Sequence, residues 1–233
     1  MIYTKTLYFP RNAFDSPTVF IASPEKVVKR MVSTVVRLEE LIVYSPFTPS
    51  GLASWISLAG PSLSKLELRM DNIAEIPTYQ QNPSKLDCLA GARSLKCLKL
   101  WGVLMIRIPK WDVFPNLRIL EITGTKLEEP ALNAVLQSCP YLRRLLLLGC
   151  EGVGSLSIEL PYLEQCKLDF YGRGNCSLSL TSSKIESLEV QGCSWIRVPE
   201  AQHLRNLSIS NSAGNWILSH SYTFLLLPFF VPK

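Results

Sequence analysis

Histidine is scarce in this chain of 233 residues, where only His203 and His220 occur. They are far apart in the sequence, and neither has an acidic residue beside it. The Gly-x-Ser-x-Gly pattern that carries a serine nucleophile is also missing. Without a cluster of acid, base, nucleophile or metal ligands, the sequence disfavours an enzyme. We therefore expect no catalytic residue, no metal site and no cofactor.

Long apolar runs are missing as well. The longest candidate, Phe224–Val231, is interrupted by Pro228 and falls short of the ~18 residues that a spanning helix needs. Residues 1–11 lack the charged, apolar and small-residue regions of a signal peptide. These absences predict a protein of the cytoplasm or nucleus that does not bind a membrane.

The chain also lacks a strong charge of one sign and a disulfide framework. The net charge is only +5, and the basic residues are spread along the chain, so nucleic-acid binding is not favoured. The seven cysteines are odd in number, contain no Cys-x-x-Cys pair and are spaced like the repeats described next. Such spacing predicts reduced thiols inside a cell.

A leucine pattern, with two residues and then one residue between leucines, repeats along the chain. Eight aligned copies predict a leucine-rich repeat solenoid, an α/β fold with a parallel sheet on the concave face and helices and irregular arcs on the convex face. Steps of 19 to 32 residues separate the copies, which start at Leu38, Leu63, Leu95, Leu117, Leu142, Leu163, Ile185 and Leu204.

The segments that return from one strand to the next differ in pattern. Residues 24–36, 50–59 and 129–139 carry apolar residues at helical spacing, so we expect helices there. Residues 101–115 and 149–161 are richer in Gly and Pro, which predicts turns or irregular arcs.

The strand-to-arc bends have a signature of their own. Three residues after the last leucine of the pattern, a small side chain bonds backbone groups at the bend. In this chain that residue is Cys150, Cys193 or Thr125 in three of the copies. The glycines before the two cysteines, Gly149 and Gly192, fit a backbone that must turn tightly. Both cysteines are therefore interpreted as bend-bonding core thiols.

The repeat copies at residues 38–43, 114–122, 138–150 and 185–193 resemble those of plant F-box/leucine-rich-repeat proteins, notably in the phrase Ser-Cys-Pro-Tyr-Leu-Arg-Arg-Leu. In that family an F-box docks on a Skp-type adaptor of a cullin ubiquitin ligase, and the repeats recruit the protein to be ubiquitinated. The resemblance thus implies a Skp-type adaptor as partner only if an F-box is supplied elsewhere.

The resemblance suggests three parts. Residues 1–23 are expected to be an N-terminal segment without a recognisable F-box, residues 24–212 the repeat domain, and residues 213–233 an atypical apolar tail. The sequence leaves three roles open: substrate recognition for a ubiquitin ligase, an F-box-independent scaffold or inhibitor-like binding protein, and a truncated gene product without the ligase role.

Alternate residues of each strand should face a protein ligand on the concave surface. This prediction places Glu67 and Glu121 on that surface, together with an apolar patch bordered by cations that resembles an interface hot spot. The alternative is that Trp101 is covered core. The expected partner-binding residues are Tyr44, Arg69, Lys99, Trp101, Ile119, Arg144, Leu146, Leu148 and Lys167.

Overall fold

Nine parallel strands form one open sheet in a computed structural model that describes residues 3–14, 23–44, 47–70, 86–171 and 176–210. Each strand pairs with the next repeat's strand, which confirms the leucine-rich repeat solenoid. In spatial order the strands are β1 (Thr6–Phe9), β2 (Glu40–Tyr44), β3 (Lys65–Arg69), β4 (Cys97–Trp101), β5 (Ile119–Thr123), β6 (Arg144–Cys150), β8 (Gln165–Phe170), β10 (Ser187–Gln191) and β12 (Asn206–Ser210).

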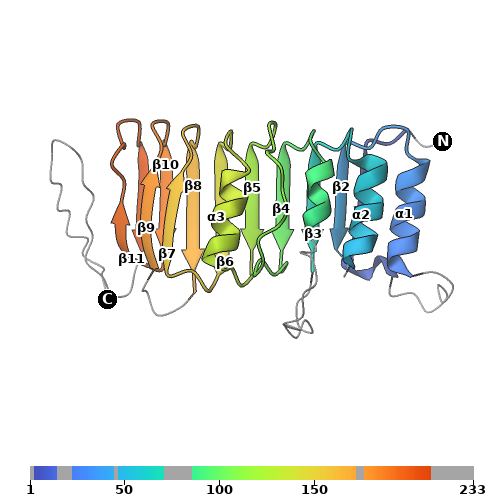
Figure 1. Cartoon of the computed structure of the whole chain (residues 1–233), viewed down its shortest axis with the longest axis horizontal. Coiled ribbons are helices and arrows are strands. Elements are labelled where there is room, and N and C mark those ends of the chain that lie inside the picture. The colour runs from blue at the N-terminus through green and yellow to red at the C-terminus, as the bar shows by residue number, and fades with distance from the viewer. Residues whose placement is uncertain (1–2, 15–22, 45–46, 71–85, 172–175, 211–233) are drawn as a thin grey trace.

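Three α-helices cover one side of this sheet, as Figure 1 shows. They are α1 (Pro24–Thr34), α2 (Pro49–Ala59) and α3 (Glu129–Gln137), and they confirm the three helical return segments. Each begins with a proline in its first turn, where the missing N–H costs no hydrogen bond. Single turns of 3-10 helix, η1 (Arg11–Phe14) and η3 (Asp87–Gly91), lie in two further connections.

The return segment at residues 149–161 is not irregular, contrary to the expectation. It contains β7 (Ser155–Glu159), which joins β9 (Cys176–Thr181) and β11 (Cys193–Arg197) in a second parallel sheet on the side that carries the helices (Figure 1). These strands form because Leu156 and Ile158 alternate with polar residues and bury one face. In the other expected irregular segment, residues 101–115, Trp101 ends β4 and the remaining residues form no named helix or strand, as expected.

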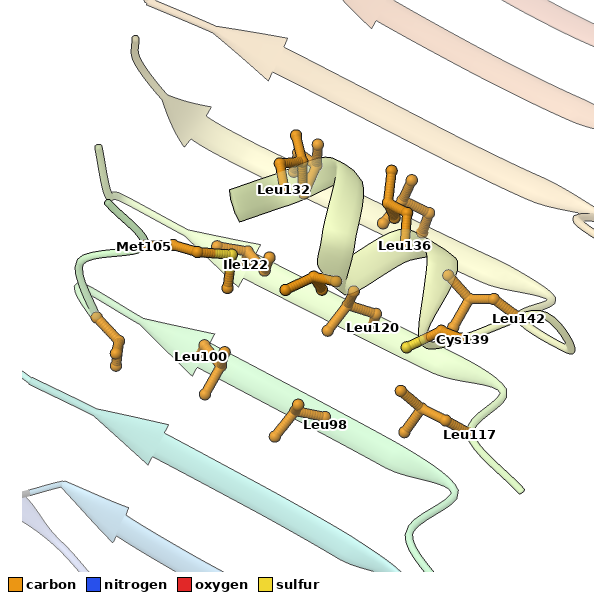
Figure 2. Packing of buried hydrophobic residues seen from close by; sticks show 14 of the residues in the cluster. Leu98, Leu100, Met105, Leu117, Leu120, Ile122, Leu132, Leu136, Cys139 and Leu142 are labelled. Carbon is orange, nitrogen blue, oxygen red and sulfur yellow. The ribbon is translucent and has the colours of Figure 1, made fainter. Parts of the chain in front are cut away.

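The core lies between the large sheet and the elements that cover it. Figure 2 shows Leu98 and Leu100 of β4 beside Leu120 and Ile122 of β5, below α3. All four side chains have no exposed area, and burial of each contributes roughly 1.5–3 kcal/mol. Because side chains alternate along a strand, this burial confirms the register predicted from the leucine spacing.

Two of the bends after the strands are stabilised as expected, those with Cys150 and Thr125. The thiol of Cys150 lies 3.6 Å from the carbonyl oxygen of Ile122, and the hydroxyl of Thr125 donates to the carbonyl of Val103 at 2.9 Å. Gly149 and Gly192 have φ angles of 59° and 84°, which other residues rarely adopt. Burial raises the pKa of the Cys150 thiol to about 11, in keeping with an unreactive core group.

At its amino end the sheet extends beyond the repeat domain expected at residues 24–212, whereas its last strand lies within that domain. The sheet already begins at β1, ahead of residue 24, because Leu7 and Phe9 bury the same face as the repeat leucines. At the other end Leu207 of β12 is 41% exposed, since among the described residues no further strand packs against it. The expected tail at 213–233 lies outside the described residues. None of the helices in the described ranges has the length and apolarity that crossing a membrane requires.

Candidate functional site

The candidate site is the face of the nine-stranded sheet that points away from the core, which we call the strand face. In β4, for example, Leu98 and Leu100 point into the core, whereas Lys99 and Trp101 lie half-buried on the strand face. All of the expected partner-binding residues occupy this face, half-buried or exposed: Tyr44, Arg69, Lys99, Trp101, Ile119, Arg144, Leu146, Leu148 and Lys167.

Strand register arranges the strand face in three rows that cross the sheet. The amino-side row comprises Glu40, Lys65, Cys97, Ile119, Arg144, Gln165 and Ser187. The middle row comprises Ile42, Glu67, Lys99, Glu121, Leu146, Lys167 and Glu189. The carboxyl-side row comprises Tyr44, Arg69, Trp101, Thr123 and Leu148.

An arginine between two aromatic rings dominates the carboxyl-side row. The guanidinium carbon of Arg69 lies 5.6 Å from the ring centre of Tyr44 and 5.4 Å from that of Trp101. Both distances are within the range of cation–π attraction. Tyr8 extends the group, because its ring meets that of Tyr44 edge-on at 5.5 Å. The rings are thereby fixed before any partner binds, which lowers the entropy cost of binding.

Glu67, a residue of the middle row, fixes the phenol of Tyr44 by a hydrogen bond. The Tyr44 hydroxyl donates a hydrogen bond of 2.6 Å to Oε1 of Glu67, a diagonal neighbour on the next strand. That hydrogen bond, with partial burial, raises the pKa of Tyr44 from 10 to about 12. Glu67 itself is buried, which corrects the expectation that it faces a ligand.

Two ion pairs neutralise much of the middle row. Nζ of Lys99 lies 2.8 Å from Oε2 of Glu121, and Nζ of Lys167 lies 2.6 Å from Oε2 of Glu189. The hydrogen bond to Glu121 raises the pKa of Lys99 above its usual value. Glu121 is buried and so is not displayed as expected. The lysines therefore present paired charges to an approaching molecule.

The expected apolar patch of Trp101, Ile119, Leu146 and Leu148 is spread over all three rows of the strand face. Trp101 and Leu148 lie in the carboxyl-side row, with Thr123 between them, whereas Ile119 lies in the amino-side row. Thr123 lies four positions after Ile119 along β5, which is roughly 13 Å of strand. Between these rows, the middle row contains the Lys99–Glu121 pair and, on β6, the apolar Leu146. Trp101 is half-buried, so it is neither a fully displayed anchor nor covered core.

Among the residues that the structure describes, three polar atoms on this face are buried without a hydrogen-bond partner: Trp101 Nε1, Thr123 Oγ1 and Asp169 Oδ1. Trp101 and Thr123 are register partners on β4 and β5. Asp169 lies near the carboxyl end of β8, opposite Gln191 of β10. Each such atom costs free energy, roughly 1–3 kcal/mol. The carboxyl-side row therefore carries unused hydrogen-bonding capacity.

A shallow hollow of about 180 Å³ opens on the amino-side and middle rows. Its lining includes the polar residues Arg144, Gln165, Lys167, Ser187 and Glu189 and the apolar Leu146. Arg144 is exposed, and its guanidinium has no ion pair within the described ranges. The hollow offers hydrogen-bond donors beside apolar surface, which suits a polar side chain of a protein ligand.

Within the described parts of the chain, no three His, Cys, Asp or Glu side chains gather as metal ligands do. The contacts of Glu67, Glu121 and Glu189 with neighbouring side chains were not predicted from the sequence. Alignment of the repeats contains a signal for the last two, because Lys99 beside Glu121 and Lys167 beside Glu189 occupy one position in consecutive copies.

Comparison with known proteins agrees with the fold. Residues 52–213 match the family model described as "FBD-associated F-box protein At5g56370, LRR repeats". F-box protein At1g10780 of Arabidopsis thaliana is 57% identical over 210 residues, which are 90% of this chain and 50% of that protein. F-box protein At4g09920 of the same plant is 29% identical over 140 residues, 58% of this chain and 42% of that protein.

A third Arabidopsis thaliana relative, putative FBD-associated F-box protein At5g56560, is 26% identical over 177 residues, 74% of this chain and 37% of that protein. The chain thus spans half the length, or less, of these curated relatives. No solved structure matches it. Because the family model covers most of the chain and its range includes the strands from β3 to β12, the chain belongs to the leucine-rich repeat family of plant FBD-associated F-box proteins.

Proposed function

We propose that the strand face recognises a partner protein, and that the chain serves as the substrate-recognition repeats of an SCF-type ubiquitin ligase. The observation that carries the first part is the Tyr44–Arg69–Trp101 stack, whose members lie on three neighbouring strands. Trp, Tyr and Arg are the residues that most often dominate the affinity of protein interfaces. Their fixed positions favour recognition of a folded or extended protein segment.

The middle row supports specificity. The pairs Lys99–Glu121 and Lys167–Glu189 present hydrogen-bonding groups at fixed positions without a large net charge. Such pairs penalise a partner whose own charges do not match them. The unpartnered Nε1 of Trp101 adds a donor that a small shift of the ring would open to a partner's carbonyl group.

The ligase role rests on the relatives, which are named as F-box proteins. In this proposal the strand face binds the protein to be ubiquitinated, and a Skp-type adaptor binds only through an F-box joined to these repeats. The chain would then act in the cytoplasm or nucleus and would carry no catalytic step of its own.

Affinity purification from plant cells tests the recognition step. Tagged wild-type chain is compared with Trp101→Ala and with Trp195→Ala, a matched control on the second sheet, where Trp195 is 36% exposed. We expect a protein that wild type and Trp195→Ala capture equally and that Trp101→Ala loses. With the purified partner, Trp101→Ala should weaken Kd by about 30-fold, as truncation of a hot spot does. Equal binding by both variants would exclude the strand face as the binding surface.

A fusion of an F-box to the chain tests the ligase role separately. We expect the fusion, but not the fusion that carries Trp101→Ala, to promote ubiquitination of the captured partner in an extract that contains a Skp-type adaptor and cullin. Binding without ubiquitination would instead favour an F-box-independent scaffold.

A further inference from the structure

Basic residues that are far apart in the sequence meet at the amino ends of the strands. The nine residues that immediately precede the strands of the large sheet form a continuous row, because each backbone N–H donates to the carbonyl oxygen of the previous member at 2.7–2.9 Å. In order across the sheet they are Lys5, Glu39, Ser64, Lys96, Arg118, Arg143, Glu164, Glu186 and Arg205.

Three cations occupy consecutive places in this row. Lys96, Arg118 and Arg143 precede β4, β5 and β6, which are neighbours in the sheet. Neighbouring strands lie ~4.8 Å apart, and like charges opposite each other on adjacent strands destabilise a sheet. Arg143 has a carboxylate partner, Glu164 at 3.0 Å, whereas the exposed Lys96 has none among the described side chains. The row therefore concentrates positive charge at a cost that an anionic partner would offset.

Two exposed tyrosine rings, Tyr141 and Tyr162, lie beside these cations. The Tyr141 and Tyr162 rings are 5.6 Å apart, and they are 43% and 40% exposed. The guanidinium of Arg118 lies 5.5 Å from the Tyr141 ring centre, and the Lys184 ammonium lies 5.0 Å from that of Tyr162. Arg118 is itself fixed, since its Nη1 donates to the carbonyl oxygens of Pro115 and Leu117.

We infer that these six residues form a second binding surface, the amino-end patch, which docks a short acidic segment of a partner protein: Lys96, Arg118, Tyr141, Arg143, Tyr162 and Lys184. Charge complementarity selects the acidic segment, and the tyrosine rings supply apolar contact area for the backbone of that segment. None of the six belongs to the strand face, so this inference does not depend on the proposed function.

The flanking carboxylates favour a protein segment over a nucleic acid. Glu164 and Glu186 follow the cations on one side, and Glu39 lies beyond Ser64 on the other. They limit the uninterrupted cationic stretch to three strands, about 10 Å, so that only a few phosphates could be neutralised, and nucleic-acid affinity falls with the number of neutralised phosphates. A few carboxylates of an extended peptide fit this length.

Fluorescence anisotropy with the 233-residue chain tests the patch. The probe is a fluorescein-labelled peptide of about eight alternating Glu and Gly residues, which spans roughly 26 Å when extended. Lys96→Glu/Arg143→Glu is compared with Lys29→Glu/Arg30→Glu, a control that makes the same change of net charge at two exposed positions of α1. We expect about tenfold weaker binding at low salt for the first variant and less than about twofold change for the control.

A neutral variant tests whether weaker binding comes from the lost charges or from misfolding of the charge-reversed chain. Lys96→Gln/Arg143→Gln introduces no repulsion with Glu164 and should keep the wild-type circular dichroism spectrum while it binds the peptide about threefold more weakly. Trp101→Ala should leave peptide binding unchanged, which separates this patch from the strand face.

Four results would overturn the inference. They are no binding by the wild type at low salt, equal losses in the patch and control variants, loss on Trp101→Ala, and tighter binding of a single-stranded oligonucleotide of equal charge through the same residues.

Discussion

The guanidinium of Arg69 lies 5.4 Å from the ring centre of Trp101, its register partner on the neighbouring strand. The same group lies 5.6 Å from the ring of Tyr44 on the other side. One side chain thus links three consecutive repeats on the strand face. The arrangement orders the surface residues of the repeats, in addition to the leucine core that stacks them.

Coupling between Arg69 and Trp101 is measurable. A double-mutant cycle of Arg69→Met and Trp101→Leu should give a coupling free energy of about 0.5–1 kcal/mol in urea unfolding, as expected for a partly exposed cation–π pair. The cycle removes contributions from other contacts of Arg69. The matched cycle of Arg69→Met and Trp195→Leu should give a value near zero, and an equal value there would disprove a direct interaction.

Core and face positions of one strand should respond differently to truncation. Leu145→Ala, at a position with no exposed area, should lower the free energy of unfolding by about 2–5 kcal/mol. Arg144→Ala, one residue earlier and exposed, should change it by less than about 0.5 kcal/mol. Leu120→Ala should behave like Leu145→Ala. If Arg144→Ala unfolds the chain while Leu145→Ala is tolerated, the strand register is shifted by one residue.

Stability should fall at high pH through Tyr44. Its hydrogen bond to Glu67 raises the folded-state pKa from 10 to about 12, so the protonated phenol is favoured by folding. This contribution is complete below pH 10 and is lost as the pH rises toward 12. Thermal unfolding followed by circular dichroism between pH 9 and 12 should show a steeper loss in wild type than in Tyr44→Phe. Parallel curves for the two proteins would contradict this role of Tyr44.

Alanine substitutions at two glycines should distinguish the cost of backbone strain from the cost of a steric collision. Gly124 has a φ of 60° and open space where a methyl group would be added, so Gly124→Ala should cost about 1 kcal/mol for its conformation alone. At Gly192, with a φ of 84°, the added methyl would also collide with the carbonyl oxygen of Phe170. Gly192→Ala should therefore cost about 3 kcal/mol or more in urea unfolding. Equal costs at both sites would show that the collision is relieved by a small shift.

The leucine spacing was enough to predict the sheet and its register. Leu98 and Leu100, like their counterparts in the other copies, can be buried only if every strand turns the same face inward, so one repeat determines the next. The helices were predictable too, because residues 49–59 and 129–137 combine an early proline with an apolar stripe. The second sheet was not, since five residues such as Ser155–Glu159 alternate too briefly to stand out from a turn.

The sequence by itself determined which residues point inward, because burial of the repeated leucines leaves one register for each strand. Only the tertiary structure decided what the outward residues do. Lys96, Arg118 and Arg143 are 22 and 25 residues apart and look scattered in the sequence, yet the stacking of repeats places them on adjacent strands. Likewise, Glu121 becomes a buried partner of Lys99 only when β4 and β5 pair. Alternation along one strand determines its faces, whereas pairing between strands brings distant side chains within reach.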